Sequence, residues 1–382
     1  MEPFAPTRLA VHVLPEDELE RKLKEGRPLR VKLGVDPTSP DVHLGFAVVL
    51  DRLREWQDAG HVVVLIVGDY TARIGDPSGR SSERPVLPDE ELDANAQHFA
   101  DQAFRILDRE RTEVRFNGEW LAKLSFAEVV RLTRMLTVSR LLERDDFAKR
   151  FIAQEPISLS ELLYPPMQAY DSVAIDADVE IGGTDQLYNL LTGRDVMERY
   201  GKPPQLVVTY PLLVGLDGEE KMSKSRGNYV GILEPPEEMF GKTMSIPDTA
   251  LVQWWELVAG GGDHPETPME WKLELARRIV ARWHGAEGAR SAEEHFTRVV
   301  RHHEAPAEVP EARFTSANGV VYLPGVLQEV LGNSVSHWRR QIDQGGVKLD
   351  GEPVRGYEIE AAALDGAVVQ AGKRRFVRFR AG

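Results

Sequence analysis

Two short polar stretches contain the residues best suited to bind a triphosphate. The first, DPTSPDVHLGF at 36–46, follows a mostly apolar run at 31–35 and leads into apolar residues at helical spacing. His43 can donate a hydrogen bond to a phosphate oxygen, and Gly45, which lacks a Cβ, allows a flat base to approach the backbone. Taken alone, this stretch could equally be a surface turn with an incidental histidine.

The second stretch, KMSKS at 221–225, comes after a strand-like run at 206–210. Lys221 and Lys224 lie three residues apart among small and polar residues. Two ammonium groups on a mobile loop suit a triphosphate whose charge shifts during a reaction. The alternative is a solvated basic loop.

HLGF followed later by KMSKS resembles the paired signatures of the class I aminoacyl-tRNA synthetases. KMSKS matches letter for letter, whereas the first motif usually reads HxGH and here ends in Phe46. We expect this change to cost a contact to the nucleotide, unless a nearby donor compensates. The resemblance implies a catalytic set of Thr38, His43, Arg80, Arg84, Lys221 and Lys224. It also implies an ATP site formed by Asp36, His43, Gly45, Gly183, Asp185, Met222, Ser223 and Lys224.

The elements around the first stretch form a βαβ pattern. The run at 31–35 reads as a strand, the segment after His43 as a helix ending near Gly60, and the charge-free run at 62–67 as a strand buried on both faces. In such a unit the loop after the first strand lies at the carboxyl edge of the sheet, where ligands bind, and the helix N-terminus attracts phosphate. We therefore predict an α/β fold with a Rossmann-like parallel sheet.

A loop dense in glycine, proline and small polar residues follows the second strand at 68–84. It also leaves the carboxyl end of a strand. Asp76 can hold a cationic amine there, and Arg80 and Arg84 can meet a leaving pyrophosphate. An ordinary surface loop would have a similar composition.

A third polar group lies at 164–186. If a helix runs from Pro165, then Tyr164, Gln168 and Asp171 fall on one face, which would be unusually polar for a core. A solvated helix face is the alternative. Gly182 and Gly183 follow a strand-like stretch and permit close backbone approach, and Asp185 can accept hydrogen bonds from both ribose hydroxyls.

The pattern YxxxQxxD followed by GGTDQ is similar to tyrosyl-tRNA synthetases in particular, from about residue 15 to the end, and most of all to the bacterial subgroup with KMSKS. In that family the residue matching Asp171 helps to read the substrate phenol, and a buried acceptor there rejects phenylalanine, a rule for which this same family is the standard worked example. The resemblance implies a tyrosine site of Asp76, Tyr164, Gln168, Asp171 and Gln186. Many members carry a tyrosine two residues before Asp36; this chain has Gly34 there, or Lys32 in an alignment one turn earlier.

Bulk properties narrow the class of protein. The 382 residues are enough for two or three domains, and 42% hydrophobic and 28% charged residues are ordinary for a globular protein. The absence of cysteine excludes disulfides, thiolate catalysis and cysteine-based zinc sites. The net charge of −14 argues against a general nucleic-acid binder, but residues 332–382 carry nine Lys/Arg and six Asp/Glu, a local +3.

Composition and resemblance together predict the domain order. Residues 1–230 are expected to form the catalytic domain, helical at 1–30 and with a helical insertion at about 89–155. Residues 231–304 are expected to form an α-helical anticodon-binding domain, 305–316 a linker, and 317–382 a small α+β domain that resembles the S4 RNA-binding module. In that module Arg339, Arg340 and Lys348 would face RNA.

The implied reaction joins L-tyrosine to tRNA-Tyr at the expense of ATP. We expect Mg²⁺ to arrive with ATP, with no metal site built from protein side chains and no organic cofactor. The resemblance also implies a symmetric homodimer, because tRNA in that family lies across two subunits. We expect a cytoplasmic protein without membrane contact, because no apolar run approaches the length of a membrane span. The alternatives are a tryptophanyl-tRNA synthetase, a nucleotidyltransferase with an HxGH loop, and a non-catalytic paralogue that binds RNA or a partner.

Overall fold

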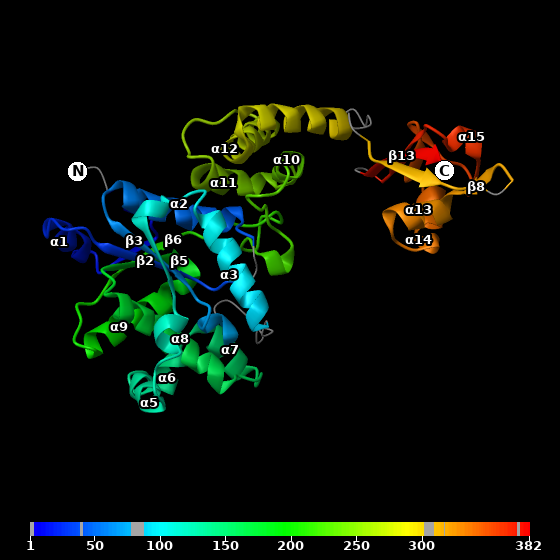
Figure 1. The fold of residues 1–382 in the computed structure, drawn as a ribbon. Helices are drawn as coiled ribbons and strands as arrows, with labels where there is room; N and C mark the ends of the chain where they lie inside the picture. The colour runs from blue at the N-terminus through cyan, green and yellow to red at the C-terminus, as the bar shows by residue number, and fades with distance from the viewer. Residues whose placement is uncertain (1–3, 39–40, 78–87, 302–308, 317, 373–374) are drawn as a thin grey trace. The chain divides into compact units, whose positions relative to one another are not determined.

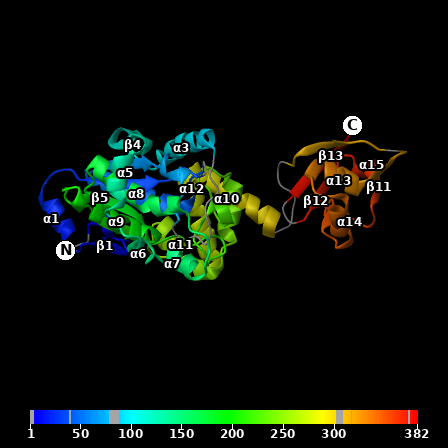
Figure 2. The same ribbon diagram turned by 90° about the horizontal axis from the view of Figure 1, so that it is seen from below.

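The computed structural model describes the chain except for residues 1–3, 39–40, 78–87, 302–308, 317 and 373–374. Figures 1 and 2 show the course of the chain in two views. The described residues divide into two compact units. The first comprises Met1–Glu234 and Ser245–His264, and the second comprises Pro235–Met244 and Pro265–Gly382.

The first unit contains a sheet of strands in the order β1-β6-β5-β2-β3-β4. Its strands are β1 His12–Leu14, β2 Arg30–Val35, β3 Val62–Val67, β4 Thr112–Phe116, β5 Val179–Gly183 and β6 Leu206–Tyr210. All are parallel except β1, which pairs antiparallel with β6. The chain runs outward from β2 to β4 and then returns to β5 on the other side of β2. The loops after β2 and β5 therefore meet at the point where the strand order reverses, which is where ligands bind in such sheets.

Helices cover both faces of this sheet, as Figure 1 shows for α2 and α11 on one side and α8 and α9 on the other. The helices of the unit are α1 Glu18–Lys24, α2 Leu44–Asp58, α3 Asp89–Ala103, α4 Gly118–Leu121, α5 Phe126–Thr133, α6 Val138–Leu141, α7 Asp145–Ile152, α8 Leu159–Ile175, α9 Leu187–Arg199 and α11 Leu251–Val258. The predicted βαβ unit is confirmed as β2, α2 and β3, and five of the six β3 side chains are buried. Ala169 and Val173 of α8 pack on Val196 and Met197 of α9.

Two strands of the sheet escaped the sequence prediction. Residues 1–30 were expected to be helical, but among the described residues 4–30 only α1 and a short 3₁₀ turn at Ala5–Thr7 are helical, and β1 pairs with β6. The insertion at about 89–155 was expected to be mostly helical and is, but it also contributes β4 at the edge of the sheet. Both strands are short and partly exposed, so they lack the apolar run that identifies a buried strand.

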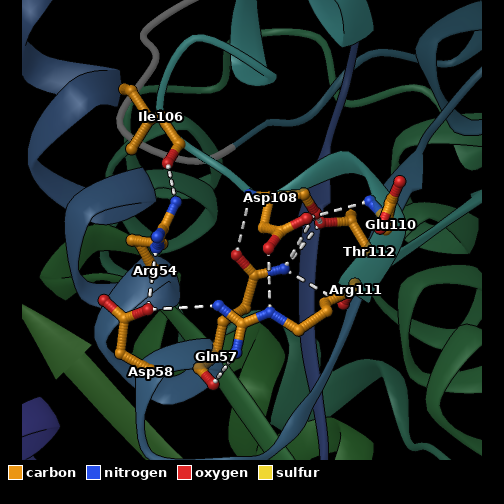
Figure 3. A network of polar contacts seen from close by, with 8 residues as sticks. All are labelled: Arg54, Gln57, Asp58, Ile106, Asp108, Glu110, Arg111 and Thr112. Carbon is orange, nitrogen blue, oxygen red and sulfur yellow. Dashed lines mark hydrogen bonds and ion pairs between the residues drawn. The ribbon is translucent and has the colours of Figure 1, made fainter.

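A buried glutamine fixes the start of β4 against the end of α2 (Figure 3). The Gln57 amide nitrogen donates to Thr112 Oγ1 at 2.7 Å and to the Arg111 carbonyl at 3.0 Å, while its oxygen accepts from the Asp108 amide at 3.0 Å. Gln57 is fully buried. These bonds determine where β4 begins and therefore where the residues that follow β4 lie.

Helix α8 begins earlier than expected. The sequence favoured a start at Pro165, yet the helix starts at Leu159, where Ser158 and Glu161 form a reciprocal capping box. Pro165 and Pro166 lie inside the helix. Both prolines are buried, as are Tyr164 and Asp171, so tertiary packing holds the helix where the prolines lack backbone donors.

The second unit contains a pair of helices and a small α+β part. Helix α10 (Pro236–Met244) packs on α12 (Pro268–Phe296), which is interrupted at Gly285, where φ is 76°. Helix α11 lies between them in sequence but belongs to the first unit, where Trp254 Nε1 donates to the Val214 carbonyl. The described part of residues 231–304 is therefore divided between the two units.

The C-terminal part has a sheet in the order β10-β9-β12-β13-β7 and a strand pair, β11-β8. Its elements are β7 Glu311–Phe314, β8 Val320–Tyr322, α13 Leu323–Leu331, α14 Val335–Asp343, β9 Val347–Leu349, β10 Glu352–Pro353, β11 Glu358–Glu360, α15 Ala361–Leu364, β12 Val368–Ala371 and β13 Arg375–Ala381. Residues 305–316 were predicted to be a linker, but β7 lies within them and pairs with β13. The strand was missed because the residues just before it are rich in alanine and proline, a composition typical of linkers. No helix among the described residues is long and apolar enough to cross a membrane.

Candidate active site

The loops after β2, β3 and β4 carry polar side chains that bond to one another at the carboxyl edge of the sheet. Asp36 follows β2 and accepts hydrogen bonds from Thr71 Oγ1 at 2.8 Å and from the Tyr164 hydroxyl at 3.0 Å. Asn117 follows β4 and donates to Thr71 Oγ1 at 3.0 Å. Gly68 leaves room for this arrangement, because a Cβ there would lie 2.2 Å from Asp36 Oδ1. Two predicted site residues, Asp36 and Tyr164, are therefore in direct contact.

Asp171 lies at the buried end of this network and is 3% exposed. It accepts a hydrogen bond from Trp120 Nε1 at 2.8 Å and from Asn117 Nδ2 at 3.3 Å. Burial raises the pKa of Asp171 to about 7, although the Lys32 ammonium and the two hydrogen bonds favour the ionised form. Such a carboxylate can accept a hydrogen bond from a hydroxyl group at the closed end of a pocket.

Sequence reasoning missed Asn117 and Trp120. Both follow β4, a strand that the sequence did not reveal. The only sequence signal was that Asn117 and Trp120 lie three residues apart just after the segment TEVRF. It indicates a site only if that segment is known to be a strand of the sheet.

Lys32 is fully buried in β2 and carries a buried ion pair. Its Nζ lies 2.8 Å from Glu180 Oε1, and it donates to Ser172 Oγ at 2.8 Å and to the Gln168 carbonyl at 3.1 Å. The Gln168 amide nitrogen also points to Glu180, at 3.4 Å. The position at which relatives have a tyrosine in one alignment is thus a lysine whose charge is matched inside the sheet.

The predicted amine-binding residue Asp76 contacts the predicted carboxyl-side residue Gln186. Gln186 Nε2 donates to Asp76 Oδ2 at 2.8 Å. Asp76 is buried, in the loop after β3, and Gln186 ends a 3₁₀ turn after β5. Arg80 and Arg84, which were expected to meet pyrophosphate, lie outside the described residues.

His43 stands at the N-cap of α2, where the first motif meets the second. The backbones join at a bridge between His43 and Gly231, and the Leu44 amide donates to the Val230 carbonyl at 2.9 Å. Burial and the nearby Lys224 ammonium lower the pKa of His43 to about 3, so the ring is neutral. Its buried Nδ1 has no hydrogen-bond partner among the described residues. A neutral imidazole at a helix N-terminus can donate to a phosphate oxygen.

Gly45 leaves room for two neighbouring side chains. A Cβ at Gly45 would lie 3.1 Å from the His43 ring and 3.5 Å from Met222 Cβ. The missing side chain therefore makes room for His43 and the KMSKS segment.

The predicted phosphate-binding residue Thr38 lies in the loop after β2. Its backbone amide donates to the Asp36 carbonyl at 2.8 Å.

Phe46 contacts the same two groups. Its ring centroid lies 4.6 Å from that of His43, and Lys224 Nζ lies 6.0 Å from the Phe46 centroid. That separation is at the outer limit of a cation–π interaction. Burial lowers the pKa of Lys224 to about 8, although Asp41 opposes the shift.

The other lysine of the KMSKS segment bonds to the predicted ribose acceptor. Lys221 Nζ lies 2.6 Å from Asp185 Oδ2, and Gly183 is needed beside it because a Cβ would lie 2.8 Å from Asp185 Oδ1. The Ser223 amide donates to Asn228 Oδ1 at 2.8 Å, and Met222 is buried. The two motifs therefore line one edge of the sheet together with Asp185.

The predicted RNA-binding residues lie in the second unit. Arg339 on α14 donates to the Tyr322 hydroxyl at 2.6 Å, and its guanidinium lies 5.3 Å from the centroid of the Tyr357 ring. Arg340 is exposed on the same helix, and Lys348 is half-buried on β9.

Comparison with known proteins supplies an independent observation. The family model described as tRNA synthetases class I (W and Y) matches residues 24–301. The chain is 48% identical over 391 residues to the tyrosine–tRNA ligase of Moorella thermoacetica, covering 97% of this chain and 94% of that protein. It is 48% identical over 390 residues to the tyrosine–tRNA ligase of Thermotoga maritima, covering 98% of this chain and 96% of that protein.

The fold is also similar to solved structures. The tyrosyl-tRNA synthetase of Archaeoglobus fulgidus, complexed with L-tyrosine, superposes with a TM-score of 0.63 at 24% identity, over 75% of this chain and 96% of that chain. This similarity is one of fold.

Proposed function

The chain belongs to the class I tRNA synthetases of the tryptophan and tyrosine group, and we propose that it is a tyrosine–tRNA ligase whose two signature loops bind ATP beside a buried tyrosine pocket. Two features of one sheet edge support this function. Asp171 is a buried hydrogen-bond acceptor that suits a phenol, and His43 and Lys224 form a group that suits phosphate. Many relatives at 45–49% identity carry the same activity in their names.

The reaction proceeds in two steps. The tyrosine carboxylate attacks the α-phosphorus of ATP, the bond from that phosphorus to the bridging oxygen of the β-phosphate breaks, and pyrophosphate leaves, which gives tyrosyl-adenylate. A hydroxyl of the terminal ribose of tRNA then attacks the tyrosyl carbonyl, and AMP leaves. The first step needs alignment and charge neutralisation rather than a protein nucleophile.

The side chains have distinct roles in this proposal. Asp171 accepts the phenol hydrogen bond, and Asp76 with Gln186 holds the amino-acid end; Tyr164 and Gln168 complete that site. Asp185 releases Lys221 when it accepts the ribose hydroxyls, so that Lys221 can join Lys224 at the leaving pyrophosphate. Asp36, Thr38, Gly45, Gly183, Met222 and Ser223 shape the nucleotide site, and Arg80 and Arg84 meet pyrophosphate. Mg²⁺ enters with ATP as part of the substrate.

Aminoacylation tests the function. We expect the purified chain to attach labelled L-tyrosine to tRNA-Tyr in the presence of ATP and Mg²⁺, and to leave tRNA for tryptophan uncharged. Charging of the tryptophan tRNA with tryptophan would instead assign the chain to the sister activity of the family.

The departure at Phe46 gives a prediction for the phosphate site. Phe46→His adds a donor beside His43, and we expect the rate of tyrosyl-adenylate formation to rise by about 10- to 100-fold, the worth of one hydrogen bond made to a charged group in the transition state. Stopped-flow measurement of the first step gives this rate. Phe46→Leu, which changes the ring without adding a donor, should not raise it, and an unchanged rate in Phe46→His would mean that the contact is already supplied.

We place tRNA binding partly in the C-terminal α+β part, which we propose acts as an S4-like module. Arg339, Arg340 and Lys348 lie on a short helix and the adjoining hairpin, in a stretch with a local net charge of +3. Two tyrosines hold the Arg339 side chain, which limits the conformational entropy lost on contact with RNA. We propose that the reaction takes place in the cytoplasm.

A homodimer accounts for the apolar residues exposed on the helices of the insertion and at the start of α8. Phe126, Ile152 and Leu159 are 83%, 81% and 81% exposed, and Phe151 and Val138 are 62% and 58% exposed. Exposed large apolar side chains can mark an interaction site. The resemblance to tyrosyl-tRNA synthetases implies a symmetric pair, so the partner we propose is a second copy of this chain.

Sedimentation tests the dimer. We expect the wild-type chain to sediment at twice its mass of 42.8 kDa, and Ile152→Glu with Leu159→Glu to sediment as a monomer at micromolar concentration. Val252→Glu is the matched control, because Val252 is an apolar residue 61% exposed on α11. A wild-type monomer that charges tRNA would refute the dimer.

A further inference from the structure

A chain of three side-chain hydrogen bonds runs from the insertion to the amine site. Arg144 Nη1 donates to Asn189 Oδ1 at 3.0 Å, Asn189 Nδ2 donates to Gln186 Oε1 at 3.0 Å, and Gln186 Nε2 donates to Asp76 Oδ2 at 2.8 Å. Arg144 caps α7, Asn189 lies in the first turn of α9, and Asp76 follows β3. Arg144 and Asn189 are 6% and 1% exposed, so water does not compete at these two positions.

The direction of every bond in this chain is determined by its two ends. A guanidinium can only donate, so Asn189 must turn its oxygen toward Arg144 and its nitrogen toward Gln186. Gln186 must then accept with its oxygen, which turns its nitrogen toward Asp76. An ionised carboxylate can only accept, so the Asp76 end requires the same direction. Neither amide can be reversed without placing like groups against each other.

The arginine at the start of the chain is itself held in place. Arg144 makes a bidentate contact with Asp146: Nη2 donates to Oδ2 at 2.6 Å and Nε donates to Oδ1 at 2.9 Å. This contact fixes the plane of the guanidinium. Asp146 comes two residues after Arg144, so this contact is local and does not depend on the substrate site.

We propose that Arg144 and Asn189 are positioning residues for tyrosine: by fixing the Gln186 amide with its nitrogen toward Asp76, they orient the Asp76 carboxylate for the substrate ammonium. This inference builds on the proposed tyrosine site. Neither residue touches the substrate. They act through Gln186, and the function of the buried arginine is to impose a direction on two amides that could otherwise turn over.

Asn189→Asp tests the proposal with almost no change in shape. The new carboxylate still accepts from Arg144 but cannot donate to Gln186, which then turns its nitrogen away from Asp76. We expect the dissociation constant of L-tyrosine, measured by equilibrium dialysis, to rise by about tenfold or more, as for a lost hydrogen bond to a charged group. The dissociation constant of 3-(4-hydroxyphenyl)propanoate, which lacks the amine, should change by less than about twofold.

Two controls separate positioning from a structural role. Asn95→Asp changes another buried asparagine of the same unit, at 6% exposure, and should alter neither constant. In a Gln186→Met background, Asn189→Asp should add no further loss, because the two residues act through the same contact. Equal weakening of tyrosine and the amine-free compound, or full tyrosine affinity in Asn189→Asp, would overturn the proposal.

The same point can be tested at the arginine if Asn189→Asp does not fold. Arg144→Lys keeps a group that only donates and should preserve the preference for tyrosine over 3-(4-hydroxyphenyl)propanoate. Arg144→Gln can present either end to Asn189 and should reduce that preference, and equal preferences in the two variants would refute the inference. Failure of the wild-type chain to bind either compound would instead refute the tyrosine site itself.

Discussion

Replacing Asp171 with asparagine is expected to lower kcat/KM for tyrosine in pyrophosphate exchange by about 100- to 1000-fold, or about 3–4 kcal/mol. Asp171 accepts from Trp120 and Asn117 while buried, and an asparagine has only one oxygen with which to accept. Its amide nitrogen would face a donor or the substrate phenol. The preference for tyrosine over phenylalanine should fall as well, because the acceptor that hydrogen-bonds the phenol of tyrosine is weakened.

Asp195→Asn is the matched control for this change. Asp195 lies on α9 at the surface, where it pairs with Arg140, and its loss should alter exchange by less than about twofold. If Asp171→Asn kept the wild-type preference for tyrosine over phenylalanine, Asp171 would not be the phenol acceptor.

The pKa of Asp171 predicts the acid side of the pH profile. The pKa is raised to about 7, so the carboxylate is protonated in a growing fraction of the enzyme as the pH falls below 7. We expect kcat/KM for tyrosine to decline below that pH, and the decline to be absent in Asp171→Asn. Lys32 and Glu180 also face Asp171, with opposite effects on its pKa, so both must be intact in this measurement.

Replacing Lys224 with methionine is expected to slow formation of tyrosyl-adenylate by about 100-fold or more while leaving tyrosine binding within about threefold. The charge of Lys224 acts on His43 and lowers its pKa, and it is most useful when pyrophosphate departs. Stopped-flow rates at saturating tyrosine and ATP measure the loss, and equilibrium dialysis measures tyrosine binding. Lys123→Met, at an exposed lysine of the insertion, should change neither quantity.

The pKa of Lys224 predicts how activity changes with pH on the alkaline side. Burial lowers the pKa of Lys224 to about 8, so the ammonium is lost as the pH rises through 8 in the unliganded enzyme. We expect kcat/KM for ATP to fall above pH 8. Bound phosphates favour the charged form, so the fall in kcat should begin at a higher pH. A wild-type rate in Lys224→Met, or a profile that is flat from pH 7 to 9.5, would exclude Lys224 from catalysis.

The sequence was sufficient to predict the centre of the fold. β2, α2 and β3 have the strongest patterns in the chain: a buried apolar run, a helix with apolar residues at regular spacing, and a charge-free strand. The contacts between Asp36 and Tyr164 and between Asp76 and Gln186 join residues that the sequence had already selected. Motifs that bind one substrate must meet in space, and this requirement is readable from the chain.

The features that the sequence missed depend on tertiary contacts. β1, β4 and β7 are short edge strands that owe their place to the partner strand and to side chains such as Gln57. Asn117 and Trp120 became recognisable as site residues only after β4 was placed. Helix α8 contains two prolines, both of them buried, and local sequence patterns do not show the tertiary packing that keeps them in a helix.

Pyrophosphate exchange with each amino acid in turn is the decisive experiment, because it requires the signature loops and the tyrosine pocket to serve one reaction. We expect exchange that depends on L-tyrosine, is far weaker with L-phenylalanine, and is absent with L-tryptophan. Exchange that depended on tryptophan alone, or no exchange with any amino acid, would contradict it.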